Sequence, residues 1–329
     1  MRPAAGRVSI GRMRTSSSDR VLAAVHRRHK LTNLLHSVLL LGGMVALLAL
    51  CGWVVAGGEG VLWSFAAGAV SLLFMPRVSP RLVLAMFGAR QLSYAEAPRL
   101  YEVMRALAER AELPAVPELH HIPSPMLNAF TVGSRARAAV AVSDGLLREL
   151  SLRELAGVLA HEISHIRNND LWVMGLADLV ASLTRFMALF GTALLLLNLP
   201  LLMTERGGVP WALVLLLTFA PTIGALLQLA LSRTREYDAD LDAAHLTGDA
   251  EGVASALARI DRLQGRPWMP GRGGPSLLRT HPDTEERVRR LMELRTPPPV
   301  LPGWEDLPVH VPFAHARHRP RYRISGYWY

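Results

Sequence analysis

Cysteine and lysine are the two residue types that this sequence nearly lacks. Cys51 is the only cysteine among the 329 residues, so no intramolecular disulfide can stabilise the fold. Lys30 is the only lysine, so almost all of the positive charge comes from arginine. Cys51 follows Leu50, which is too bulky for the cleavage site of a lipoprotein signal, and we expect the thiol to pack in the interior.

The arginines flank apolar runs. The formal net charge is +9, and a basic balance of this size is typical of proteins that bind nucleic acid or anionic lipid. The basic residues before the first apolar run and after the second are Arg20, Arg27, Arg28, Lys30, Arg77, Arg81 and Arg90. Because basic residues beside a membrane span favour the cytoplasmic side, this placement indicates membrane topology and argues against nucleic acid as a partner.

Half of the residues are hydrophobic, which is too many for an ordinary soluble domain. They are concentrated in four runs, at residues 38–56, 61–75, 186–203 and 211–231. Since a helix of roughly 20 apolar residues crosses a bilayer, we expect two transmembrane hairpins. For the second pair of runs, two buried core helices are the alternative. The first run is longer than a signal-peptide core and lacks a small-residue cleavage site, so we expect it to remain as an anchor.

Between the two pairs of runs the sequence has the composition of a soluble domain. Helical spacing of apolar residues predicts a helix over 97–111, and short β-type segments predict strands over 118–122, 128–132 and 138–142. Ser151 and Glu154 form a capping-box pattern, which predicts that a helix begins there and continues to about residue 166.

Residues 161–165 read His-Glu-Ile-Ser-His, inside this expected helix. Because residues four apart lie on one helical face, His161 and His165 can bind the same ion. Zinc suits imidazole and carboxylate ligands, so the pattern predicts a zinc site with Glu162 beside it as the catalytic base. The alternative is an exposed helix in which the spacing has no function.

A second acidic segment contains a candidate for the third ligand. A hydrolytic zinc site needs three protein ligands and one open position. Glu236 and Asp240 lie four residues apart in the segment 232–240, so one helical face presents both. We predict that Glu236 binds zinc and that Asp240 accepts the outer N–H of His161. A solvated charged face is the alternative, and the His-Glu-x-x-His pattern upstream favours the metal site.

These motifs resemble those of the HtpX-type membrane zinc metalloproteases, which are related to the CAAX prenyl proteases. The resemblance covers most of residues 35–295 and rests on HEISH at 161–165, SRTREYDAD at 232–240, Asn128-Ala129-Phe130, Thr280-His281-Pro282 and the order of the apolar hairpins. It implies a multi-pass endopeptidase of the bacterial inner membrane that binds one zinc ion per chain. It also implies an active site that faces the cytoplasm and cleaves misfolded or damaged membrane proteins.

The resemblance also suggests a role for His281. Its side chain would donate a hydrogen bond to the oxyanion that forms at the peptide carbonyl, while Glu162 transfers the proton. Alternatively, His281 has a structural role at the start of the following helix. The segment 128–132 is typical of an edge strand, to which an extended substrate adds through main-chain hydrogen bonds, so Asn128, Ala129 and Phe130 are candidate substrate-strand residues.

We therefore expect a mostly α-helical integral membrane protein, with two transmembrane hairpins and a zincin-like α+β catalytic domain that contains the His-Glu-x-x-His helix and a small β-sheet. The expected segments are a disordered basic leader at 1–32, a transmembrane hairpin at 33–76, the first part of the catalytic domain at 77–182, a second hairpin at 183–231, the second part of the domain at 232–295 and a tail rich in proline, arginine and aromatic residues at 296–329.

Two other functions share parts of this pattern. A CAAX-type processing protease would use the same metal chemistry, but four apolar runs are too few for its enclosed chamber of many spans. A non-catalytic membrane scaffold would tolerate the loss of Glu162, His165 or Glu236, and all three are present. The expected partners are therefore polypeptide substrates, membrane proteins among them, and the lipid bilayer.

Overall fold

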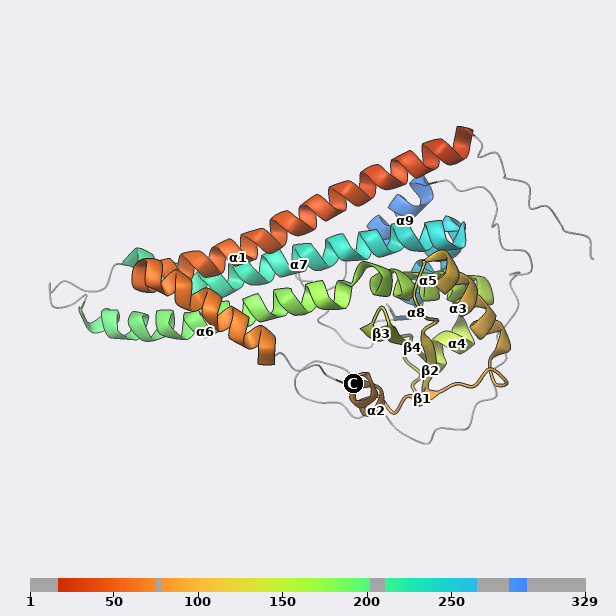
Figure 1. Ribbon diagram of the computed structural model, residues 1–329, viewed down its shortest axis with the longest axis horizontal. Coiled ribbons are helices and arrows are strands. Elements are labelled where there is room, and N and C mark those ends of the chain that lie inside the picture. The colour runs from red at the N-terminus through yellow and green to blue at the C-terminus, as the bar shows by residue number, and fades with distance from the viewer. Residues whose placement is uncertain (1–16, 75–78, 202–210, 265–283, 295–329) are drawn as a thin grey trace, which may run out of the picture.

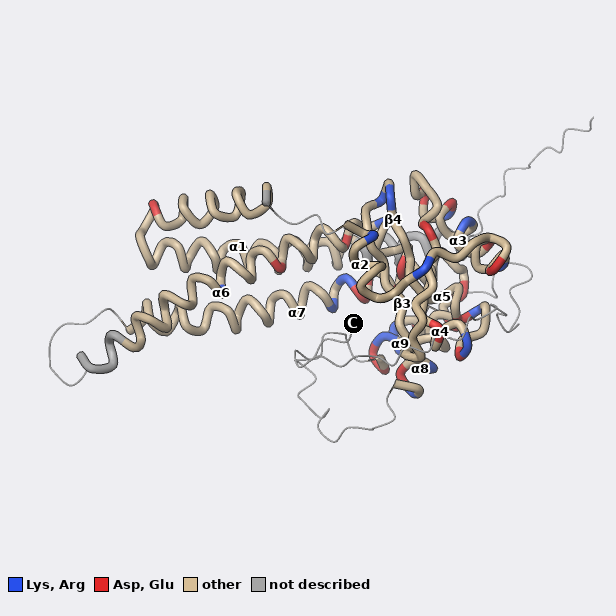
Figure 2. Tube along the Cα trace, turned by 90° about the horizontal axis from the view of Figure 1, so that it is seen from below, with Lys and Arg blue, Asp and Glu red and all other residues tan. Residues whose placement is uncertain are grey.

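A computed structural model describes residues 17–74, 79–201, 211–264 and 284–294. Over these residues the chain forms a long helical arm and a domain of shorter helices around a small sheet (Figure 1). Figure 2 shows that the charged residues gather in the domain, whereas the arm contains few of them. The protein is thus mostly helical, with its apolar and polar parts separated in space.

The arm consists of α1 (Ser17–Phe74), α6 (Asp170–Leu201) and α7 (Trp211–Thr247), which are long and apolar enough to cross a membrane. Two limbs of α1 meet at a kink at Ala56 and Gly57, so this helix forms the first hairpin. Gly57 has a φ of +59°, a conformation that side chains with a Cβ rarely adopt. The arm packs around a small core of Met44, Leu48, Ala177, Val180, Ala181 and Leu231.

The basic leader is shorter than the sequence predicts. Helix α1 begins at Ser17, so residues 17–32 are helical and the expectation of disorder up to residue 32 is wrong for them. Leu22, Ala23 and Ala24 are strong helix formers, and they extend an existing helix without a new nucleation step. Residues 1–16 lie outside the described part of the chain.

The sheet has the order β1-β2-β4-β3, from strands Arg90–Gln91, Glu118–Ile122, Arg137–Ser143 and Ala129–Ser134. β2 and β4 are parallel, and β3 pairs with β4 in antiparallel register. β3 therefore lies at an edge of the sheet, as the sequence predicts, although the strand begins one residue after Asn128. Helix α2 (Pro80–Met86) covers one face of the sheet through Leu84, which packs with Ile122.

The other face of the sheet packs against the main core of the domain. The helices around this core are α3 (Pro98–Arg110), α4 (Asp144–Glu149), α5 (Leu152–Asn168), α8 (Ala250–Gln264) and α9 (Thr284–Glu293). The predicted capping box is present at the start of α5, where Ser151 and Glu154 each bond to the backbone of the other. Asn169 adopts a left-handed conformation and ends α5, and α6 begins at the next residue.

The arm and the domain are joined by continuous helices. The predicted boundaries after residues 182 and 231 fall inside α6 and α7, which extend from the arm into the domain (Figure 1). A continuous helix keeps its backbone groups bonded, whereas a break would leave up to four N–H and four C=O groups without partners. Consequently α7 contributes residues to both the arm and the domain.

Candidate metal centre

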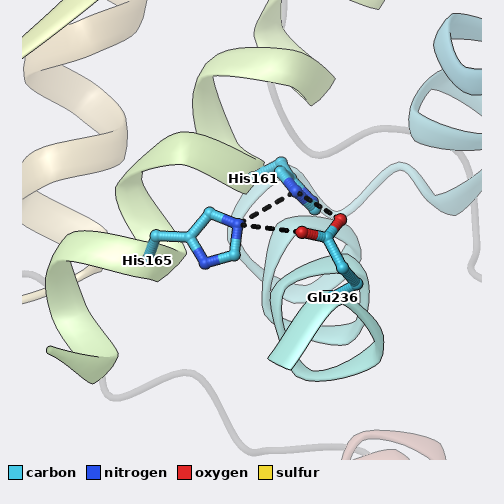
Figure 3. A group of neighbouring side chains, drawn as sticks. All are labelled: His161, His165 and Glu236. Carbon is cyan, nitrogen blue, oxygen red and sulfur yellow. Dashed lines mark hydrogen bonds and ion pairs between the residues drawn. The ribbon is translucent and has the colours of Figure 1, made fainter. Parts of the chain in front are cut away.

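The two histidines of the His-Glu-x-x-His pattern lie one turn apart on α5 and point toward Glu236 on α7 (Figure 3). The Nε2 atoms of His161 and His165 are 3.1 Å apart. Glu236 faces both, with its carboxylate oxygens 3.5 Å from Nε2 of His161 and 4.0 Å from Nε2 of His165. All three side chains are partly buried, so the structure brings the three predicted ligands together.

The separations between these atoms suit a zinc ion. In a tetrahedral site with bonds of roughly 2.0–2.1 Å, ligand atoms are about 3.3 Å apart. The three separations here lie on either side of that value, and all the ligand atoms lie within 4.8 Å of one another. Two imidazoles and one carboxylate are also a ligand set that zinc accepts while one position stays open. The residues present therefore fit the metal that the sequence predicts.

Each histidine has a carboxylate behind its outer nitrogen. Nδ1 of His161 lies 3.1 Å from Oδ1 of Asp240, the partner that the sequence predicts. Nδ1 of His165 bonds to Oδ2 of Asp170 at 2.8 Å. Such carboxylates keep the proton on Nδ1, so that the Nε2 lone pair remains free for a metal. The sequence analysis missed Asp170, and its position beside the end of α5 was the available signal.

Arginines neutralise these carboxylates. Arg287 on α9 donates from Nε and Nη2 to both oxygens of Asp240, each at 2.7 Å, and its Nη1 lies 3.3 Å from Glu236. Nη1 of Arg235 lies 3.2 Å from Asp170. Sequence reasoning identified neither arginine. The only signal for Arg287 was its spacing of four from Leu291, which places both on the buried face of α9.

The site strongly favours a positive charge between its carboxylates. Burial opposes the charged form of His161, but the nearby carboxylates of Asp240 and Glu236 outweigh it and raise the pKa of the imidazole to about 10. Burial also opposes the charge of Arg287, yet Asp240 and Glu236 raise the pKa of this side chain. A divalent cation would take the place of the imidazolium proton, so its binding would release a proton.

Glu162 is buried on the same helix, between the two histidines in sequence. Its Oε2 accepts a hydrogen bond of 2.7 Å from the Thr131 hydroxyl of β3, a contact that the sequence analysis missed. Asn128 lies just before β3, and its N–H donates to Oγ of Ser143 at 2.9 Å. His281 lies outside the described residues.

Comparisons with known proteins show which family this chain belongs to. Residues 94–295 match the family described as Peptidase family M48. A curated relative named Protease HtpX homolog, from Methylibium petroleiphilum, is 34% identical over 286 residues, which are 80% of this chain and 98% of the relative. A relative of the same name from Trichormus variabilis is 34% identical over 272 residues, 78% of this chain and 94% of the relative.

One solved structure, a crystal structure of Ste24p from S. mikatae, has a TM-score of 0.49 and 19% identity. The aligned region covers 80% of this chain and 66% of the Ste24p chain. The family resemblance inferred from the motifs is confirmed by the matched family and the curated relatives. Three helices of the described residues can cross a membrane, and the matched region includes the three converging side chains. The chain belongs to peptidase family M48 and is a membrane metalloprotease.

Proposed function

We propose that this protein is a zinc endopeptidase in which His161, His165 and Glu236 hold one zinc ion per chain. The observation that supports this proposal most strongly is the convergence of the three side chains, each histidine having a carboxylate behind it. The M48 family is zinc-dependent in general, which agrees with the ligand set. When bound, the ion supplies Lewis acidity at the scissile carbonyl.

Glu162 is the proposed general base. Its carboxylate lies on the helix that presents the two histidines, so it takes the proton of the attacking water and returns it to the leaving amine. His281 is the proposed donor to the oxyanion. On this proposal the variant His281→Ala should lower kcat by about 10²–10³ and leave the zinc content unchanged. An unchanged kcat would remove His281 from the mechanism.

The proposed substrate is an extended polypeptide that adds to β3. β3 pairs with β4 on one side only among the described strands, so its other edge can bond to a further strand. Main-chain hydrogen bonds do not depend on the substrate side chains, which gives broad specificity. Ala129 and Phe130 are part of this strand, and Asn128 precedes it.

Broad specificity suits the removal of misfolded or damaged membrane proteins, which is the proposed biological role. The relatives named Protease HtpX homolog support this role. We further propose that the protein lies in the bacterial inner membrane with its active site facing the cytoplasm. The support for this orientation is the arginine placement beside the apolar runs.

Replacement of the base tests the proposed function. Glu162→Gln keeps the shape of the side chain but cannot take a proton, so turnover should fall by about 10²–10⁴ while zinc stays bound. The matched control is Glu102→Gln on α3, outside the site, which should keep wild-type turnover. Membranes that contain Glu162→Gln should accumulate proteins that the wild type degrades, as proteomic comparison would measure. Wild-type turnover by Glu162→Gln would refute the proposal.

A further inference from the structure

The Thr131 hydroxyl makes a buried contact with the proposed base. The side chain lies in the middle of β3, and its Oγ1 is 2.7 Å from Oε2 of Glu162. The carbonyl oxygen of Glu162 is also near, at 3.4 Å, but a hydroxyl has one proton and the shorter contact is the better bond. Both side chains are buried, so water competes little for this bond. One carboxylate oxygen of Glu162 is therefore bonded to Thr131, and the other can take the proton of the attacking water.

The main chain of Thr131 faces the open edge of the sheet. The N–H of Ser143 donates to the carbonyl oxygen of Asn128 at 2.9 Å, so Asn128 bonds toward β4. Bonded and non-bonded pairs alternate along an antiparallel ladder. Phe130 and Val132 therefore bond toward β4 as well, whereas the N–H and C=O of Thr131 point away from it.

We propose that Thr131 is a positioning residue for peptide hydrolysis, in which its main chain binds the substrate strand while its hydroxyl fixes the carboxylate of Glu162. This inference rests on the proposed zinc peptidase function and deepens it. A glutamate side chain has three rotatable bonds, and a bond to one carboxylate oxygen restricts them. Thr131 would thus hold both the base and the bound peptide. Proton transfer requires these two groups to keep a fixed relative orientation.

The proposal predicts a change in kcat without a change in KM. Thr131→Val keeps the shape and the main chain but removes the donor, so kcat should fall about 10-fold or more while KM and zinc content stay as in the wild type. Thr131→Ser keeps the donor and should retain most of kcat. The matched control is Thr184→Val, because the buried Thr184 hydroxyl bonds only to Val180 of its own helix among the described residues, at 2.9 Å.

An infrared difference spectrum of the full-length protein, prepared without zinc, gives a second readout that does not depend on activity. Thr131→Val should shift a carboxylate stretching band relative to the wild type, since one carboxylate loses a hydrogen bond. The same substitution in a Glu162→Gln background should shift no carboxylate band. The proposed hydrogen bond would be refuted by a band shift of equal size in both backgrounds. It would also be refuted if no band shifted in either background.

The outcomes separate this inference from the function on which it rests. If Glu162→Gln is inactive and Thr131→Val has wild-type kcat, the positioning role is wrong and the peptidase function stands. If Thr131→Val lowers kcat but Thr131→Ser lowers it equally, the hydroxyl is not the cause and the inference is also wrong. If Glu162→Gln is fully active, the proposed function itself fails, and the positioning role fails with it.

Discussion

The two halves of α7 have opposite surroundings although they belong to one continuous helix. Residues 211–231 leave Leu215, Phe219 and Leu226 exposed on the arm. From residue 232 onward the helix buries the polar and charged side chains Thr234, Arg235, Asp238, Asp240 and Asp242. Glu236 lies about 7.5 Å along the helix axis from Leu231, since each residue adds about 1.5 Å. One continuous helix therefore carries a residue of the candidate site close to the end of its apolar half.

The buried charges of the second half are stable because other elements pair with them. Asp240 contacts Arg287 of α9, and Asp238 accepts a hydrogen bond of 3.0 Å from Asn33 of α1. Asp242 accepts from the Ser164 hydroxyl of α5 at 3.0 Å. The apolar half needs only complementary shape, whereas the charged half needs specific partners. Substitutions in the two halves should consequently have different effects.

The largest effect on stability is expected in the charged half. Arg287→Met leaves the buried carboxylate of Asp240 without its cation, which should lower the free energy of unfolding by about 3–5 kcal/mol. The control Arg289→Met removes an exposed arginine of the same helix, which pairs with Glu286, and should have a much smaller effect. Thermal unfolding in detergent would measure both. Equal losses from the two variants would contradict the difference between the halves.

A smaller effect is expected from the packing of the apolar half. A Cβ at Gly191 of α6 would lie 2.5 Å from Cβ of Leu217 on α7, so Gly191→Ala forces the two helices apart. Overpacking of this kind costs about 1–3 kcal/mol. Gly42→Ala is the matched control, because its Cβ would meet no atom within 4 Å. Zinc content should stay unchanged in both variants, and loss of zinc from Gly191→Ala would show that the halves are not separable.

The smallest effect concerns a charge pair outside the metal site. Burial alone would raise the pKa of Asp249. The hydrogen bonds from Arg153 and from the N–H of Gly252 outweigh burial, so the pKa lies below its usual value. A lowered pKa favours the ionised form in the folded state. The resulting stability is present above the unfolded pKa of about 4 and is lost as the pH falls through the folded value.

The pair should contribute about 1 kcal/mol or less, because Arg153 is partly exposed to solvent. Asp249→Asn should therefore show a flatter stability profile than the wild type as the pH falls below about 4. Chemical unfolding at several pH values would measure the two slopes. Identical slopes would mean that Asp249 contributes nothing to the acid sensitivity.

The predictable features are those fixed by spacing within one element. The four-residue spacings of His161 to His165 and of Glu236 to Asp240 define helical faces, so the ligand set could be inferred. The capping box of α5 and the edge position of β3 were likewise local patterns. Asp170, Arg287 and Thr131 were not predictable, because they act through contacts between elements whose packing no short pattern records.

The sequence pattern also did not predict that α6 and α7 continue from the arm into the domain without a break. A change from apolar to charged residues at 231–232 looks like a domain boundary, yet the backbone needs no break there because the partners of the charged half come from elsewhere in the fold. The same reasoning explains the start of α1. Arginines among residues 17–32 resemble a leader, but leucine and alanine at its centre continue the helix.

Zinc content is the most direct test of the account. Elemental analysis of the purified wild type should give one zinc ion per chain, and His165→Ala and Glu236→Ala should each lose it, because two remaining ligands hold the ion poorly. His36→Ala, an exposed histidine of α1, is the control and should keep the zinc. Full zinc retention by both His165→Ala and Glu236→Ala would contradict the proposed site.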